Sequence, residues 1–202
     1  MLGVSAQVKP DFVIIGEASE LNIKCGQRGR AEVVLETFGV PAHSANPDKG
    51  VNAVYKMAEL VLAIRQLAPP VHPVLGKGIL ELTDIKSSPY PGASVVPDHC
   101  RATYDRRLLV DETPESVLEP LQNLIQKQMA ADLALQAKVS FAVGQETCHT
   151  GAVIEGTRFF PGWVFPAESD FVAQSHQAVR WCSLSAANSA VSRRKTFDRP
   201  AV

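Results

Sequence analysis

Three short stretches of the sequence carry side chains that could serve a chemical site, and the first contains Glu17. An apolar run, residues 12–15, ends at Gly16 and is typical of a strand buried on both faces. The carboxyl end of such a strand is where open α/β sheets bind ligands, and a carboxylate there can coordinate a metal ion. A turn or helix cap would also explain Glu17, so the residue alone does not decide between the two.

The second stretch surrounds His43, in Val40–Ala45, between a predicted strand and a predicted helix. An imidazole on a loop can donate a hydrogen bond or accept a proton. An ordinary surface histidine is the alternative interpretation.

The third stretch is Tyr104-Asp105-Arg106-Arg107. In a strand, Asp105 and Arg107 lie on one face, and Tyr104 and Arg106 lie on the other. The guanidinium fork of an arginine suits a carboxylate ligand. A surface Asp–Arg ion pair is the alternative. The neighbours Cys148 and His149 point apart on an extended chain, so they form a weak candidate for a nucleophile–base pair or a metal site.

Hydrophobic periodicity predicts the elements that position these residues. Apolar residues alternate over 30–38, recur at helical spacing over 51–62, and alternate again over 78–85, 98–108 and 137–143. A second helix over 113–129 begins with Thr113 as its N-cap and Pro114 at its first position. The order β-α-β-β-α-β predicts an α+β, ferredoxin-like domain, an antiparallel sheet with two helices on one face.

Composition narrows the function classes. The chain has 202 residues, of which 46% are hydrophobic and 20% charged, and its net charge is −1. Such a balance predicts no nucleic-acid partner and no membrane partner, and a membrane-spanning run of about 20 apolar residues is not found. Four widely spaced cysteines without a Cys-x-x-Cys pair predict reduced thiols in a cytoplasmic protein. A ferredoxin-like RNA-binding module is disfavoured because the strands lack paired aromatic residues.

Taken together and in order, these segments resemble a known family. The chain is similar to the zinc metallopeptidases and deacylases that include acetylornithine deacetylase, succinyl-diaminopimelate desuccinylase and carboxypeptidase G, and most of all to the selenium-metabolism-linked hydrolases among them. The segments that carry the resemblance are Val13–Ser19, Gly26–Arg30, Gly39–Ala45, Gly50–Met57, Ser94–Asp98 and Asp105–Arg107.

The resemblance implies a metal-dependent hydrolase of N-acyl amino acids or small peptides, with two zinc ions and a homodimer formed through a lid domain. It implies that Glu17 binds zinc, that Arg107 binds a substrate carboxylate, and that His43 enters the partner's site and stabilises an oxyanion. It also implies three segments: a catalytic-domain fragment over 1–23, the dimerisation lid over 24–145, and a partial return to the catalytic domain with an unstructured tail over 146–202.

The sequence also departs from the family pattern. The His-x-Asp motif, the bridging Asp, the Glu-Glu pair and the C-terminal His ligand are not found in it, and Ser94 replaces a common Asn. A catalytic zinc needs three protein ligands. We therefore expect an incomplete chain that carries the dimerisation domain, and whether it is itself an enzyme stays open. The alternative is a non-catalytic dimerisation module, or a truncated or frameshifted product without activity.

Overall fold

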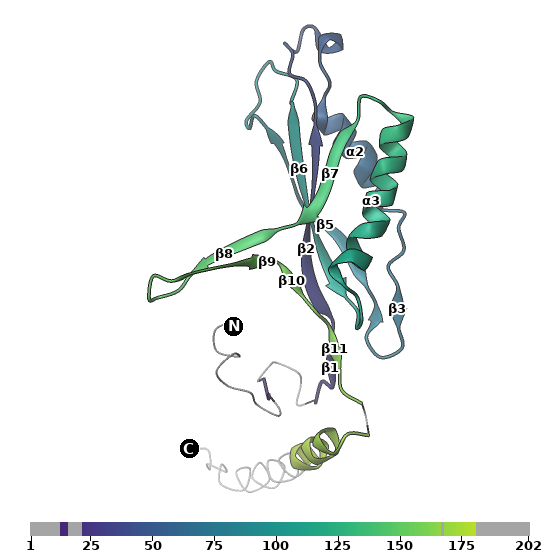
Figure 1. Ribbon diagram of the computed structural model, residues 1–202, viewed down its shortest axis with the longest axis vertical. Helices are drawn as coiled ribbons and strands as arrows, with labels where there is room; N and C mark the ends of the chain where they lie inside the picture. The colour runs from purple at the N-terminus through teal and green to yellow at the C-terminus, as the bar shows by residue number, and fades with distance from the viewer. Residues whose placement is uncertain (1–12, 16–21, 167, 181–202) are drawn as a thin grey trace, which may run out of the picture. The chain divides into compact units, whose positions relative to one another are not determined.

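The predicted sheet and both predicted helices lie in one compact unit, Gly26–Val164 (Figure 1). The computed structural model describes residues 13–15, 22–166 and 168–180. The main elements of the unit are β2 (Gly29–Phe38), α2 (Ala53–Ile64), β5 (Ile79–Ser88), β6 (His99–Leu108), α3 (Pro114–Ala131) and β7 (Gln136–Phe141). Their order confirms the predicted α+β, ferredoxin-like succession.

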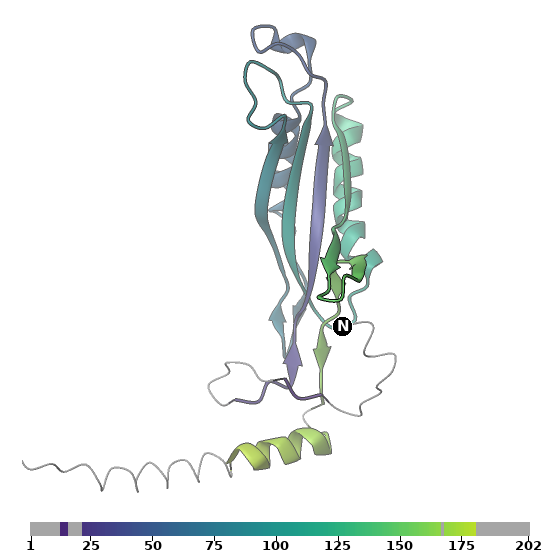
Figure 2. The same ribbon diagram turned by 90° about the vertical axis from the view of Figure 1, so that its left-hand side faces the viewer.

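The main sheet has five strands and is antiparallel throughout. Strand β2 pairs along its whole length with β6, which in turn pairs with the edge strand β5. On its other side β2 pairs with β7 and, nearer its start, with the short strand β10 (Phe159–Phe160). Figure 2 shows the long strands running side by side. Because register is fixed along four strands, residues far apart in sequence are held opposite one another.

The core lies between the sheet and the two helices. Ala31, Val33 and Leu35 of β2 are almost fully buried, as the alternating pattern predicts. Their partners are apolar residues at helical spacing: Met57, Leu60 and Ile64 of α2, and Val117, Leu121 and Ile125 of α3.

Both helices begin at capping residues. The Asn52 side chain accepts hydrogen bonds from two backbone amides of α2, and Thr113 and Ser116 form a capping box at the start of α3. Thr113 is therefore the N-cap that the sequence predicts, with Pro114 at the first helical position.

The compact unit begins at Gly26, two residues after the predicted start of the lid, and extends past its predicted end at residue 145. Strand β8 (Val143–Thr147) forms a hairpin with β9 (Val153–Thr157) that extends away from the main sheet (Figure 1). After β10, strand β11 (Trp163–Val164) returns to pair with β1 (Gly26–Gln27). The remaining pair of strands, β3 (Val71–His72) and β4 (Gly76–Lys77), follows α2. The 3-10 helix η1 (Pro47–Lys49) precedes α2.

The second unit combines the two ends of the chain, and its described part contains a helix over residues 170–180. Of the predicted buried strand over residues 12–15, the structure describes residues 13–15: Val13, Ile14 and Ile15 are between 63% and 84% exposed and form no strand. A strand buried on both faces needs neighbours, and no described segment pairs with these residues. Glu17 and the predicted unstructured tail from residue 181 lie outside the described residues. No described helix is long and apolar enough to cross a membrane.

Candidate functional site

His43 lies in a pair of loops at one end of the main sheet. The loop after β2 contacts the loop between β5 and β6 through a bridge between His43 and Val95. Two backbone hydrogen bonds strengthen this contact, from the Ser44 amide to the Ser94 carbonyl at 3.0 Å and from the Val96 amide to the Ala42 carbonyl at 2.8 Å. We call the two loops, residues 39–52 and 89–98, the tip.

The base of the tip requires a glycine. A Cβ atom at Gly39 would lie 2.0 Å from the carbonyl oxygen of Val51, which is closer than real atoms approach. The Val40 amide donates to that same carbonyl at 2.9 Å. Gly39 therefore lets the chain leave β2 and return to α2 without opening the loop.

The His43 side chain is exposed, and its ring is oriented by its own loop. Its Nδ1 accepts a hydrogen bond from the Ala45 amide at 3.1 Å. An acceptor nitrogen carries no proton, so the neutral ring has its proton on Nε2. The Nε2–H group of His43 is thus available to donate a hydrogen bond to a ligand or protein group next to the tip.

Ser94 beside His43 has an unusual backbone conformation, with a positive φ of 56°. Among residues other than glycine, asparagine is several-fold enriched in this left-handed region. The positive φ at Ser94 explains why asparagine suits this position, where the sequence resemblance implies a common Asn.

Arg107 lies at the opposite end of the sheet and belongs to a cluster of three charged residues. Its Nε is 2.8 Å from Oδ1 of Asp105, and the Nε of Arg30 is 2.8 Å from Oδ2 of the same carboxylate. The ion pair confirms that Asp105 and Arg107 share a face. Arg30 was not predicted, because only the register between β2 and β6 places it opposite Arg107.

The ends that carry His43 and Arg107 are far apart within one chain. Arg107 pairs with Arg30, whereas His99 pairs with Phe38 just before the tip, eight residues further along β2. At about 3.3 Å per residue, this separation corresponds to roughly 26 Å. The structure therefore does not bring these two predicted site residues together within one lid.

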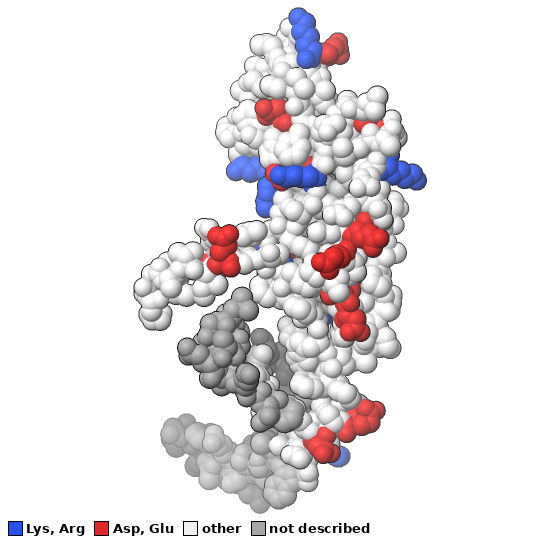
Figure 3. Space-filling view, viewed as in Figure 1, with Lys and Arg blue, Asp and Glu red and all other residues white. Residues whose placement is uncertain are grey.

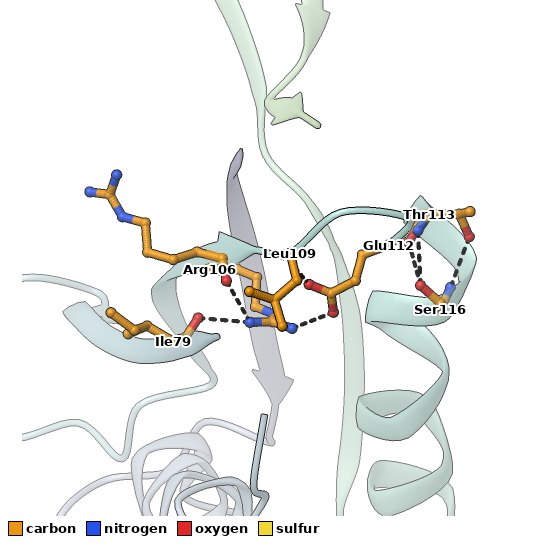
Figure 4. Close-up of polar contacts among 7 residues, drawn as sticks. Ile79, Arg106, Leu109, Glu112, Thr113 and Ser116 are labelled. Atoms are coloured by element: carbon orange, nitrogen blue, oxygen red, sulfur yellow. Dashed lines mark hydrogen bonds and ion pairs between the residues drawn. The ribbon is translucent and has the colours of Figure 1, made fainter. Parts of the chain in front are cut away.

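A buried ion pair fixes the end of β6 where Arg107 lies (Figure 4). Arg106 is only 5% exposed, and its Nη2 contacts Oε1 of Glu112. Its Nη1 donates to the carbonyls of Arg107, at 2.7 Å, and Ile79, at 3.2 Å. Glu112 in turn accepts from the Leu109 amide at 2.6 Å. Because Arg106 points into the molecule, its neighbour Arg107 must point out.

Another acidic residue on the open face of the sheet, Glu36, is already paired. Glu36 contacts His99 at 3.1 Å and Lys138 at 2.9 Å. Burial by itself raises the pKa of Glu36, but these two hydrogen bonds outweigh it and leave the pKa below its ordinary value. On the face shown in Figure 3, some Lys and Arg side chains lie beside Asp and Glu side chains, whereas other acidic side chains have no basic neighbour. Glu36 thus links β2 to β6 and β7 and stabilises the sheet.

The described residues do not fit a metal ion. No three His, Cys, Asp or Glu side chains gather within that part of the chain. Cys148 and His149 lie in the turn that joins β8 to β9, and among the described residues they belong to no such group. A catalytic zinc needs three protein ligands and an open position, so these residues support no metal-centred step.

Comparison with known proteins identifies relatives. The sequence profile of the peptidase dimerisation domain matches residues 25–132. The uncharacterized protein YgeY of Escherichia coli (strain K12) is 32% identical over 158 residues, which are 77% of this chain and 38% of that protein. Acetylornithine deacetylase of Vibrio vulnificus (strain CMCP6) is 41% identical over 59 residues, 29% of this chain and 16% of that protein.

Solved structures share the fold. A tripeptidase from Staphylococcus aureus matches 79% of this chain and 36% of its own, with a TM-score of 0.53 and 16% identity. The aminopeptidase PepT from Bacillus cereus matches 74% of this chain and 34% of its own, with a TM-score of 0.50 and 17% identity. In each comparison this chain spans less than two fifths of the relative's length.

Proposed function

Because the chain belongs to the family of peptidases and deacylases that share this dimerisation domain, we propose that it is the dimeric lid of a metal-dependent amide hydrolase. The proposed substrates of the whole enzyme are N-acyl amino acids or small peptides. The names of the relatives, which include a deacetylase, an aminopeptidase and a tripeptidase, support amide bonds as the target.

One observation carries the proposal: His43 and Arg107 lie at opposite ends of the same pair of strands. One substrate molecule is too small to reach both ends of one lid. If both residues serve each active site, then every site takes His43 from one subunit and Arg107 from the other.

The free edge of the sheet offers a way to bring the two ends together. Strand β5 pairs only with β6 among the described strands, so its other side has unpaired backbone groups. A two-fold axis perpendicular to the sheet would pair β5 with the partner's β5 in antiparallel fashion. That pairing places the tip of one lid beside the Arg107 end of the other.

The two side chains then have complementary roles. The outward Nε2–H of His43 suits the oxyanion that develops when an amide carbonyl is attacked. The Arg107 guanidinium suits the carboxylate of an amino-acid substrate. By resemblance Glu17 would be one zinc ligand, and the motifs that supply the family's other ligands are not found in this sequence.

A non-catalytic dimerisation module is the second candidate. The lack of a three-residue metal group among the described residues favours it for this chain taken alone. Hydrolysis of N-acetyl amino acids by the chain in the presence of zinc would decide against this second candidate.

The test of the lid arrangement measures distances between spin labels in the dimer. One sample of the chain carries a label at Ser44→Cys in the tip, and another carries it at Ile79→Cys, opposite Arg107, with the four native cysteines replaced. After the samples are mixed, we expect a distance between subunits that is shorter than the within-chain distance between the same two positions.

The control is a doubly labelled chain diluted with unlabelled chain, which reports the within-chain distance. A distance between subunits equal to or longer than the control would contradict the proposed lid. So would a chain that sediments only as a monomer at micromolar concentrations.

A further inference from the structure

We infer that Arg30 and Arg107, held together by Asp105, form a binding site for a ligand that carries two carboxylates. Naming this ligand as a substrate rests on the proposed function, whereas the binding itself does not. Under that function, the substrate class is the N-acyl derivatives of amino dicarboxylic acids.

The first observation is the register of the two arginines. Arg30 of β2 and Arg107 of β6 are direct partners in the antiparallel sheet. Directly opposed residues have Cα atoms about 4.5–5.5 Å apart, and their side chains leave the sheet on the same face. Two guanidinium groups are therefore side by side.

The second observation is the way in which Asp105 holds them. It contacts both arginines through their Nε atoms, with 2.8 Å for each contact. In both arginines the edge formed by Nη1 and Nη2 is left for other partners. No hydrogen bond within the described part of the chain engages those four nitrogens.

This arrangement differs from that of the other arginines on the same face. Arg101 uses its Nη1 to bind the Thr103 hydroxyl at 2.9 Å, and Arg158 uses its Nη1 to bind Glu32 at 3.2 Å. In each of these two arginines Nη1 is already engaged, whereas neither terminal nitrogen of Arg30 or Arg107 makes a hydrogen bond within the described residues.

Exposure agrees with a binding role. The side chains of Arg30 and Arg107 are 49% and 45% exposed, while Asp105 between them is only 18% exposed. Two further carboxylates lie opposite Asp105 on the same face: Glu32, which pairs with Arg158, and Glu81. The binding role therefore rests on the exposed, oriented guanidinium edges and not on the net charge.

The number of free edges indicates the ligand. One Nη1/Nη2 edge can bind one carboxylate through two parallel hydrogen bonds. Two neighbouring edges match two carboxylates on one short molecule, such as the side-chain and main-chain carboxylates of an acidic amino acid. A monocarboxylate can fill one edge through two hydrogen bonds, or bridge both arginines with one oxygen on each as Asp105 does at the Nε atoms, but it cannot fill both edges.

Titration of the chain with glutarate tests the inference, with butyrate and inorganic phosphate as comparison ligands. Nitrogen-15 NMR spectra follow the arginine Nε–H signals during each titration. We expect glutarate to bind at least about tenfold more tightly than butyrate, because it forms a second charge-assisted pair of hydrogen bonds. Equal affinity for the two, or tighter binding of phosphate than of glutarate, would overturn the inference.

Substitutions locate the site. Arg30→Gln should lower glutarate affinity about tenfold and leave butyrate affinity within about twofold, since Arg107 still binds one carboxylate. Arg30→Lys keeps the charge but removes the planar fork, so it should lose most of the preference for glutarate. The matched control is Arg101→Gln, on the same face of β6, which should change neither affinity.

The outcomes separate this inference from the proposed function. A glutarate preference that depends on Arg30 supports the site even if the tip and the Arg107 end stay far apart in the dimer. Glutarate affinity that is unchanged in Arg30→Gln overturns the site even if the spin-label distances support the lid.

Discussion

At the scale of single residues, Arg106 and Glu112 illustrate how strongly a buried charge depends on its partner. The pair is 6% and 13% exposed and links β6 to the loop before α3. Removal of one partner from a buried pair leaves an uncompensated charge, which costs about 3–5 kcal/mol. We therefore expect Glu112→Gln to lower the free energy of unfolding by about 3 kcal/mol in urea denaturation.

Two variants control this prediction. Glu119→Gln removes an exposed carboxylate from α3 and should leave the unfolding free energy within about 0.5 kcal/mol of the original protein. The double variant Arg106→Met with Glu112→Leu removes both charges and should recover most of the lost stability. A single variant as stable as the original protein would show that the pair does not anchor β6.

The candidate site could be predicted from the sequence only in part. Alternation within one strand is enough to place Asp105 and Arg107 on one face, and their ion pair confirms it. Arg30 is 75 residues away from Asp105 in sequence, and their contact depends on strand register. Local periodicity carries no information on register between distant strands, so the cluster could not be predicted.

At the scale of elements, a salt bridge connects α2 with the end of α3. Lys56 of α2 contacts Asp132, the C-cap of α3, at 2.5 Å. The hydrogen bond to Lys56 lowers the pKa of Asp132, and the same bond raises the pKa of Lys56. The bridge is therefore at full strength between the ordinary pKa values of the two groups, about 4 and about 10.4.

The direction of the pH effect follows from these shifts. A carboxyl group whose pKa is lowered by folding adds stability above its unfolded pKa, and this stability is lost as the pH falls through the folded pKa. We expect Asp132→Asn to reduce the drop in urea midpoint between pH 7 and pH 3. Asp48→Asn in η1 is the control and should leave that drop unchanged. An identical drop in the original protein and in Asp132→Asn would contradict the prediction.

The long elements could be predicted from the sequence, whereas the short strands could not. Strands β2 and β6 and helices α2 and α3 each run for ten residues or more and show a clear apolar period. Strands β10 and β11 have two residues each and exist only because they pair with β2 and β1. A two-residue segment has no period, which is why the compact unit extends past the predicted boundary at residue 145.

At the scale of the whole molecule, association should use the edge strand β5. Beside this edge a groove runs between α2 and β5, lined by apolar side chains that include Val61, Leu80, Leu82 and Tyr104. Burial raises the pKa of Tyr104 to about 12, with Glu81 adding to the effect, so its hydroxyl stays neutral in this groove. Ile85 of β5 is 48% exposed although its sheet partner, Ala102, is fully buried. An antiparallel pairing of two β5 strands would cover Ile85.

We therefore expect Ile85→Lys to weaken self-association, because a charge at a covered apolar position must lose its water without gaining a partner. A cost of about 3 kcal/mol would raise the dimer dissociation constant more than a hundredfold in sedimentation velocity. The matched control is Leu133→Lys, a more exposed apolar residue before β7 at the other side of the sheet, which should leave the dissociation constant unchanged. If Leu133→Lys dissociates the dimer and Ile85→Lys does not, then the subunits meet through the β7 side. In that case the β5 pairing could not bring His43 of one lid to the Arg107 end of the other.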